Sequence, residues 1–182
     1  MKGKKLAFID LETTGINAFK HEILEIGCML VRQNEDGTFT TLEEFEVKVK
    51  PEHIETAEIG ALRVNGYDEN QWLFAHTQKE ALTLISQKCD GAVMVAQNAS
   101  FDYSFLSVGF GKYDVPDPFF YAKLDTISFA YLRFRNDPAM DSFSLRKLCE
   151  RFNIKNEKAH TAMADIRATF EIFKHLLGRK TQ

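Results

Sequence analysis

Two carboxylates, Asp10 and Glu12, stand one residue apart where the apolar run Leu6–Ile9 ends. If this run is a strand, side chains alternate, so both carboxylates point to one face and Leu11 points to the other. Like charges this close repel and raise each other's pKa. A divalent cation such as Mg²⁺ or Mn²⁺ removes the conflict, because hard cations prefer carboxylate oxygens. The pair is a candidate metal site, although two acids that begin a solvated loop have the same spacing.

Two more acids and a histidine follow at positions where they could join this pair. Asp102 comes just after an apolar run and at the start of a predicted helix, where a favourable interaction with the helix dipole would also account for it. Asp165 falls on the margin of a helical apolar face, where a carboxylate needs a partner. Five residues of helix turn through about 140°, so His160 converges with Asp165 only if it lies before the helix or in its first turn. An imidazole there can take a proton from water near neutral pH.

The segments around these residues predict a mixed α/β fold. Strands over Leu6–Leu11, Ile23–Arg32 and Phe39–Val49 form an antiparallel meander. Short strands at Ala92–Ala96 and Tyr121–Leu124 then alternate with helices, which indicates parallel strands in the same sheet. The predicted helices are Thr77–Lys88 with a capping box from Thr77 to Glu80, Ser100–Val108, Thr126–Phe134, a helix capped by Ser142 or Ser144, and Thr161–Leu177.

Composition narrows the class of protein. The 182 residues are 45% hydrophobic and 27% charged, which predicts one globular domain over residues 1–182. The net charge of −3 does not favour the binding of a polyanion. A nucleic-acid ligand would therefore need metal ions to offset the negative charge of the acids. Apolar runs fall far short of the roughly 20 residues that span a bilayer, so we expect a cytoplasmic protein without membrane contact. Three scattered cysteines with no CxxC pair indicate reduced, buried thiols.

Three segments resemble, in order, the three motifs of the DEDDh (DnaQ-like) 3′–5′ exonucleases, which have a ribonuclease H-like fold. They are Phe8–Gly15, Gln97–Leu106 and His160–Asp165, and they span nearly the whole chain. The resemblance implies that Asp10, Glu12, Asp102 and Asp165 are the four metal-binding acids and that His160 is the general base. Thr161 stands where the sister subfamily has a tyrosine, so the histidine branch is the better match.

The resemblance implies a metal-dependent enzyme that releases nucleoside 5′-monophosphates from the 3′ end of single-stranded nucleic acid, with DNA favoured and RNA possible. Two Mg²⁺ or Mn²⁺ ions would act together. Asp10 would bridge both ions, and Glu12 and Asp165 would complete the site of the attacking water. Asp102 would help to hold the second ion, and His160 would accept the proton of the water.

Substrate-binding residues are less sharply indicated. The turn after Glu12 could offer free backbone N–H groups to a phosphate or sugar. Phenylalanines near the motifs could stack on bases, although two of them four residues apart on a helix could simply pack together. Asn65 and Gln97 each stand where many relatives have histidine, which leaves substrate preference open. The candidates are Thr13, Thr14, Gly15, Leu62, Asn65, Asn98, Phe101 and Phe105.

Other classes of function stay open. A non-catalytic module that binds nucleic acid or a polymerase could share this fold, but such a module would not need all four acids and the histidine. A proofreading subunit that joins a polymerase through its surface, or a homodimer, stays open, although we expect a stand-alone enzyme because only Gly178 to Gln182 follow the last predicted helix.

Overall fold

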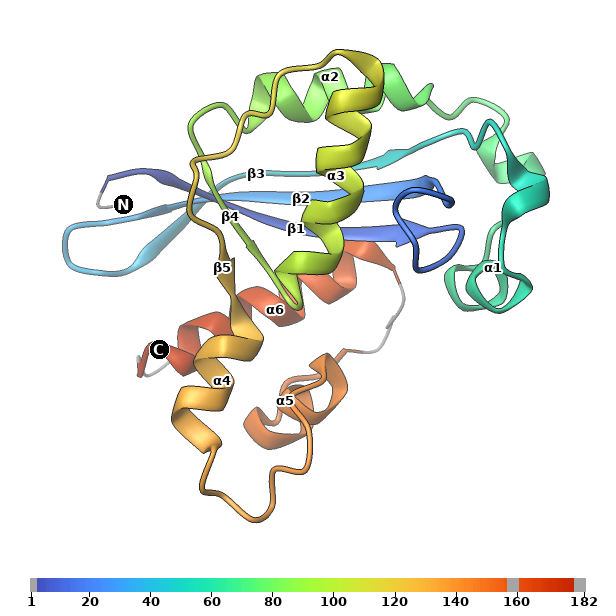
Figure 1. Cartoon of the computed structure of the whole chain (residues 1–182). Coiled ribbons are helices and arrows are strands. Elements are labelled where there is room, and N and C mark those ends of the chain that lie inside the picture. The colour runs from blue at the N-terminus through green and yellow to red at the C-terminus, as the bar shows by residue number, and fades with distance from the viewer. Residues whose placement is uncertain (1–2, 157–160, 179–182) are drawn as a thin grey trace.

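A mixed five-stranded sheet is the centre of the structure, a computed structural model that describes residues 3–156 and 161–178. The strand order is β3-β2-β1-β4-β5. Strands β1 (Lys5–Thr13), β2 (Ile23–Gln33) and β3 (Phe39–Lys48) pair antiparallel, which confirms the predicted meander. Strand β4 (Val93–Ala96) pairs in parallel with β1, and β5 (Leu124–Asp125) pairs in parallel with β4 (Figure 1).

Helices cover both faces of this sheet. Helices α2 and α3 lie on one face and α6 lies on the other (Figure 1). Helix α5 packs on α6 rather than on the sheet, and α4 also contacts α6. The helices are α1 (Ile59–Asn65), α2 (Gln78–Lys88), α3 (Ala99–Tyr113), α4 (Thr126–Phe134), α5 (Leu145–Phe152) and α6 (Ala162–Leu176), with short 3₁₀ helices η1 (Ile54–Thr56) and η2 (Glu69–Trp72).

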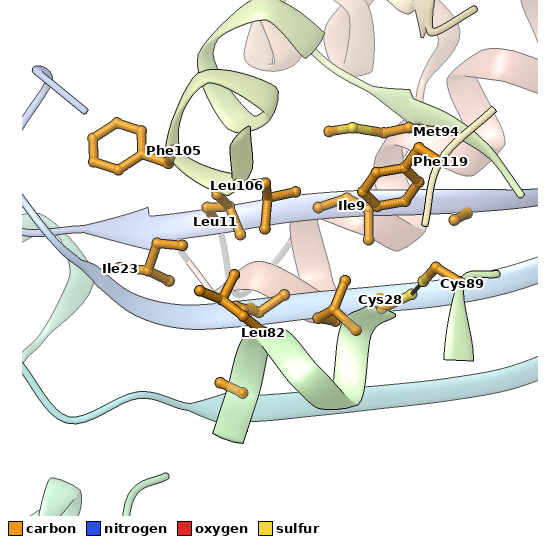
Figure 2. Close-up of a cluster of buried hydrophobic side chains, with 14 of the residues drawn as sticks. Ile9, Leu11, Ile23, Cys28, Leu82, Cys89, Met94, Phe105, Leu106 and Phe119 are labelled. Carbon is orange, nitrogen blue, oxygen red and sulfur yellow. Dashed lines mark hydrogen bonds between the residues drawn. The ribbon is translucent and has the colours of Figure 1, made fainter. Parts of the chain in front are cut away.

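Alternation along β1 divides the core into two layers. Ala7, Ile9 and Leu11 pack against α2 and α3, in the cluster that Figure 2 shows. Phe8 faces the opposite way and meets two rings of α6, Phe170 and Phe173, edge to face at 5.1 and 5.4 Å between centroids. Asp10 and Glu12 continue this second face, so the acids come out on the side that α6 covers.

The cysteines behave as the sequence predicts. All three are free and buried. Cys28 of β2 and Cys89, at the end of α2, bring their Sγ atoms to 3.7 Å in the core between the sheet and α2 (Figure 2). Among the described residues, no helix combines the length and the apolar character that crossing a membrane requires.

Several helix ends are also as predicted. Thr77 and Glu80 form the expected capping box at the start of α2. Of the two serines considered for α5, Ser144 is the cap, since its side chain accepts a hydrogen bond from the Lys147 N–H. Helix α4 has the predicted bounds, and α6 differs from its prediction by one residue at each end.

Other elements depart from the predictions. Helices η1, α1 and η2 are absent from the sequence prediction. Helices η1 and α1 bury no residue, so they leave no apolar period in the sequence. The last strand is Leu124–Asp125 rather than Tyr121–Leu124, since only these two residues pair with β4. Helix α3 continues past Val108 to Tyr113, because Phe110 adds another turn to its buried face.

Helix α6 packs tightly against β2 at Gly27. A Cβ atom on this glycine would lie 2.6 Å from Cδ1 of Ile166 and 2.8 Å from Cβ of Ala162. Gly27 is paired with Asp10 across β1 and β2, so the close approach occurs directly beside the first carboxylate.

We expect Gly27→Ala to lower the free energy of unfolding by about 1–3 kcal/mol, because the added methyl overpacks this contact. Urea denaturation measures the change. Gly111→Ala is the matched control: Gly111 lies in α3 with open space around it, so the same substitution there should be neutral or stabilising by up to about 1 kcal/mol. Equal effects at both positions would contradict the close-contact explanation.

Candidate metal centre

Three carboxylates converge at the end of β1. Asp10, Glu12 and Asp165 each offer one oxygen, and these three oxygens all lie within 4.8 Å of one another. Asp10 and Glu12 share a face because they are two residues apart on a strand, as predicted. Asp165 lies in the first turn of α6, which packs over that same face. Carboxylate oxygens at this spacing suit a hard divalent cation.

Burial and mutual repulsion make the ionised forms of Asp10 and Glu12 unfavourable. Burial is the largest cause that raises the pKa of Asp10, and the charges of Asp102, Asp165 and Glu12 raise it further. For Glu12, burial first and then the charges of Glu25 and Asp165 raise the pKa to about 8. The site therefore holds more negative charge than it can stabilise without a cation.

Asp102 lies beside this cluster but is used differently. It is 2% exposed in the first turn of α3, and its Oδ1 accepts a hydrogen bond from the Leu11 N–H at 3.0 Å. Burial raises its pKa above the ordinary value for an aspartate. Among the described residues, Asp102 is not one of the three acids whose oxygens meet within 4.8 Å, although its charge is the strongest of those acting on Asp10.

His160, the predicted base, lies outside the described residues. Helix α6 begins at Ala162 and has Thr161 at its cap position. Asp165 also receives a hydrogen bond from Nδ2 of Asn156, a residue that follows α5. A cavity of about 680 Å³ beside α5 has Asp165 and Asn156 in its wall.

The turn after β1 is tightly hydrogen-bonded. Thr14 donates its N–H to the carbonyl of Glu22 at 2.9 Å, and its hydroxyl accepts from the Glu22 N–H. The expectation of free N–H groups is therefore wrong at Thr14, because the Thr14 N–H closes the loop. The Thr13 hydroxyl donates to the carbonyl of Gly15 at 2.8 Å. Gly15 has no room for a side chain, since its Cβ would lie 2.4 Å from the ring of His21.

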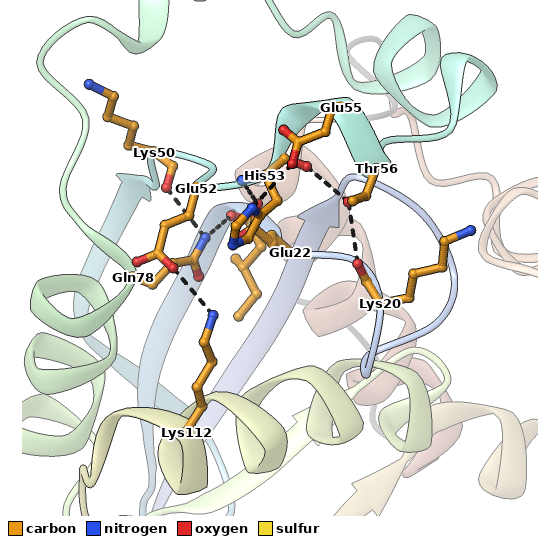
Figure 3. Close-up of polar contacts among 10 residues, drawn as sticks. Lys20, Glu22, Lys50, Glu52, His53, Glu55, Thr56, Gln78 and Lys112 are labelled. Atoms are coloured by element: carbon orange, nitrogen blue, oxygen red, sulfur yellow. Dashed lines mark hydrogen bonds and ion pairs between the residues drawn. The ribbon is translucent and has the colours of Figure 1, made fainter.

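Neighbouring segments fix this loop from outside. The His53 N–H donates to Oε2 of Glu22 at 2.8 Å, and the Thr56 hydroxyl donates to the carbonyl of Lys20 at 3.3 Å (Figure 3). On the other side, the Asn65 side chain donates to the carbonyl of Thr13 at 3.1 Å, which attaches α1 to the end of β1. Asn65 therefore fixes the position of α1 at the end of β1. Half-buried Leu62 lies one helical turn before Asn65.

The second motif is anchored through Asp125. Asn98 adopts a left-handed backbone conformation, with φ of 68°, before α3. Its N–H and that of Ala99 donate to the two oxygens of Asp125, each at 3.1 Å. Gln97 donates to the carbonyl of Phe143 and accepts from the Thr126 hydroxyl. The amide of Gln97 thus holds the chain before α5.

The two aromatic candidates on α3 pack together. The ring centroids of Phe101 and Phe105 are 5.2 Å apart. Phe105 is 3% exposed and belongs to the core between the sheet and α3, so its proposed contact with substrate is wrong. Phe101 is half-buried at the edge of that core.

Sequence reasoning missed Asp125 and Glu25. Glu25 is a buried acid on β2, opposite Glu12 in the antiparallel register. One signal for it exists, since a single carboxylate interrupts the apolar run from Ile23 to Leu30. Asp125 precedes a predicted helix and caps α4 by accepting from the Ile127 N–H, so a search for helix caps could have found it. Its contacts with Asn98 and Ala99 at the start of α3 join distant segments and leave no signal in the local sequence.

Protein free of metal should become less stable as pH rises. Between pH 4.5 and about 8 the folded state keeps a proton on Glu12 that the unfolded state has lost, so unfolding becomes easier as pH increases through this window. The melting temperature in EDTA should therefore fall from pH 5 to pH 8, and Glu12→Gln should flatten the fall. Glu69→Gln, at an exposed acid of η2, should leave the slope unchanged. A wild-type melting temperature that does not decline with pH would contradict the crowding of these carboxylates.

Comparisons with known proteins identify the family and the fold. A family model described as "Exonuclease", of the RNase T family, matches residues 7–173. Ribonuclease T of Shewanella denitrificans is 31% identical over 185 residues, covering 94% of this chain and 79% of that protein. Ribonuclease T of Baumannia cicadellinicola is 30% identical over the same share of this chain and 82% of its own length.

Solved structures show the same fold. Escherichia coli exonuclease I in complex with a dT13 oligonucleotide superposes with a TM-score of 0.77 at 20% identity over 96% of this chain. A zinc-bound form of the exonuclease I–single-stranded DNA complex gives 0.80 at 19% identity over 98%. This chain spans 40–41% of those two exonuclease I chains. With its motifs in order and its family matched over nearly its whole length, the chain belongs to the DEDDh (DnaQ-like) 3′–5′ exonucleases of the ribonuclease H-like superfamily.

Proposed function

We propose that residues 1–182 act as one exonuclease domain that removes nucleotides one at a time from the 3′ end of single-stranded nucleic acid. The observation that carries the proposal is the meeting of Asp10, Glu12 and Asp165 within 4.8 Å, at a place where burial and neighbouring charges raise the pKa of Asp10 and of Glu12. A site that merely bound nucleic acid would gain nothing from concentrated negative charge, since phosphates would be repelled.

Two Mg²⁺ or Mn²⁺ ions fit the donor set. All the candidate ligands are carboxylates, and hard cations prefer oxygen donors. The charges of Glu12 on the same strand and of Asp102 on α3 both act on Asp10, so Asp10 would help to hold both ions. Glu12 and Asp165 would hold the ion next to the attacking water, and Asp102 would support the second. When bound, such ions stabilise the charge that develops on a phosphodiester and make the water more acidic.

The protein groups then have separate tasks. His160 would accept the proton of the water, since an imidazole is partly neutral at working pH. The turn at Thr13–Gly15 and helix α1, which Asn65 joins to β1, would border the terminal nucleotide. Water would attack the phosphorus of the terminal phosphodiester, the P–O3′ bond would break, and the 3′ oxygen of the shortened strand would leave and take up a proton. The phosphate then stays on the 5′ oxygen of the released nucleotide, so the product is a nucleoside 5′-monophosphate.

Single-stranded DNA and RNA are both candidate substrates. The family resemblance gives DNA as the favoured substrate, and the structural relatives include exonuclease I bound to dT13. The relatives with the higher identity are named Ribonuclease T, which gives RNA 3′ ends equal weight. A direct comparison of substrates decides between the two.

Labelled substrates test the function. We expect stepwise loss of nucleotides from the 3′ end of single-stranded oligonucleotides in Mg²⁺ or Mn²⁺, resolved on denaturing gels, and no loss in EDTA. DNA, RNA, duplex and dinucleotide substrates are compared at equal concentration. Asp10→Asn should abolish turnover yet melt at the same or a higher temperature, because one repelling charge is gone. Asp90→Asn, at an exposed acid after α2, is the control and should remain fully active. Degradation that persists in EDTA would overturn the metal mechanism.

The histidine has its own test. His160→Ala should lower kcat by about 10²–10⁴-fold, the range for loss of a general base, while Mn²⁺ binding measured by calorimetry stays near that of the wild type. His175→Ala, on the last turn of α6, is the matched control and should leave kcat unchanged. An undiminished rate in His160→Ala would show that another group accepts the proton.

A further inference from the structure

Glu25 makes an unusual contact for a strand residue. It is 7% exposed, on the face of β2 that α6 covers, and its Oε1 accepts a hydrogen bond from the Ala162 N–H at 3.2 Å. The two residues are 137 positions apart in the chain. A buried carboxylate is costly unless it has such a partner, so the contact accounts for an acid within an otherwise apolar strand.

Ala162 is the first residue of α6. The first N–H groups of a helix have no partner within the helix, and a cap residue usually supplies one. Thr161 occupies the cap position but gives no side-chain hydrogen bond to the end of the helix. The carboxylate of Glu25 does this work from the neighbouring strand, and its negative charge also suits the positive end of the helix dipole.

The same strand fixes α6 at a second point. Gly27, two residues after Glu25 and on the same face, lets Ala162 and Ile166 approach the sheet closely. Packing at Gly27 sets the distance of the helix from the sheet. The hydrogen bond that the Ala162 N–H donates to Glu25 fixes the helix along its axis and in rotation at Ala162, one turn before Asp165.

Direct metal binding by Glu25 is the competing explanation. Among the described residues, the acids whose oxygens meet within 4.8 Å are Asp10, Glu12 and Asp165, and Glu25 is not one of them. Glu25 is paired with Lys48 of the neighbouring strand β3. The ammonium of Lys48 lies 3.9 Å from the centre of the Trp72 ring. Burial and the charge of Glu46 raise the pKa of Glu25, and they outweigh the Ala162 N–H and the charge of Lys48, which both favour its ionised form. The contacts of Glu25 are thus with the helix N-terminus and β3 rather than with the three clustered carboxylates.

We propose that Glu25 is a positioning residue, which caps α6 from β2 and thereby holds Asp165 in reach of Asp10 and Glu12. Its effect on catalysis rests on the proposed function, but its effect on the helix and on metal binding does not. The carboxylate is needed as a hydrogen-bond acceptor, so an amide oxygen at the same position can replace it.

Two substitutions separate the acceptor from the charge. Glu25→Ala removes both, and Glu25→Gln keeps an oxygen that can accept from the Ala162 N–H. We expect Glu25→Ala to speed hydrogen exchange at the amides of the first turn of α6, to weaken Mn²⁺ binding about 10–100-fold, and to lower kcat by a similar factor with little change in KM. Glu25→Gln should recover most of each loss.

Glu46→Ala is the matched control. Glu46 is an exposed acid on β3, paired with Gly27, and its charge acts on Glu25. Removing it alters the local charge without touching α6, so exchange, Mn²⁺ affinity and kcat should stay near those of the wild type. Hydrogen exchange and Mn²⁺ binding can be measured even if the protein has no exonuclease activity. The inference can therefore fail or succeed separately from the proposed function.

Three outcomes would overturn the proposal. Unchanged exchange at the start of α6 in Glu25→Ala would show that the cap is unimportant. A Glu25→Gln variant as impaired as Glu25→Ala in Mn²⁺ binding would show that the charge, and so a direct or electrostatic role, is what matters. Loss of protection spread over the whole sheet would show a general structural role rather than positioning of one helix.

Discussion

Repulsion among buried carboxylates is the constraint that the rest of this structure has to satisfy. Asp10 and Glu12 are two residues apart on β1, so the alternation of the strand points both side chains to the same face of the sheet. Asp165 arrives on a different element, and its negative charge opposes the approach of α6. The helix stays in place because apolar contacts outweigh that opposition: Phe8 packs edge to face on Phe170 and Phe173, and Ile166 is buried against Gly27. The core beneath the site therefore stabilises an arrangement that electrostatics alone would separate.

The uncompensated charge also gives the site its preference for a cation. Strand alternation places Asp10 and Glu12, and the packing of α6 places Asp165, so a bound ion would remove a repulsion that the fold itself creates. Protons compete for the same oxygens, as the pKa of about 8 for Glu12 indicates. Metal affinity should accordingly be coupled to pH through these carboxylates, which must lose their protons to act as ligands.

Sequence patterns predict those parts of the structure whose causes are local. The first three strands and α2, α4 and α6 were found because apolar periodicity and caps such as Thr77 lie within a few residues of what they control. Helix α1 buries no side chain, so its residues carry no such period. The acid pair Asp10 and Glu12 was readable from strand alternation, whereas the contact of Glu25 with α6 depends on packing between distant segments. The burial of Phe105 likewise depends on how α3 crosses the sheet.

The end of β4 links the fold to the second motif. Strand β4 pairs with β1 only from Leu6 to Phe8, so the backbone of Leu11 lies beyond it and has no β4 partner. A buried N–H without an acceptor is destabilising, and Asp102 supplies the acceptor. Leu11 thus has two tasks: its side chain fills the core under α3, and its N–H fixes the carboxylate of Asp102 beside Asp10. A slip of one residue in the register of β1 would turn Leu11 into the site and the two acids into the core, so the same register that builds the hydrophobic core also builds the metal centre.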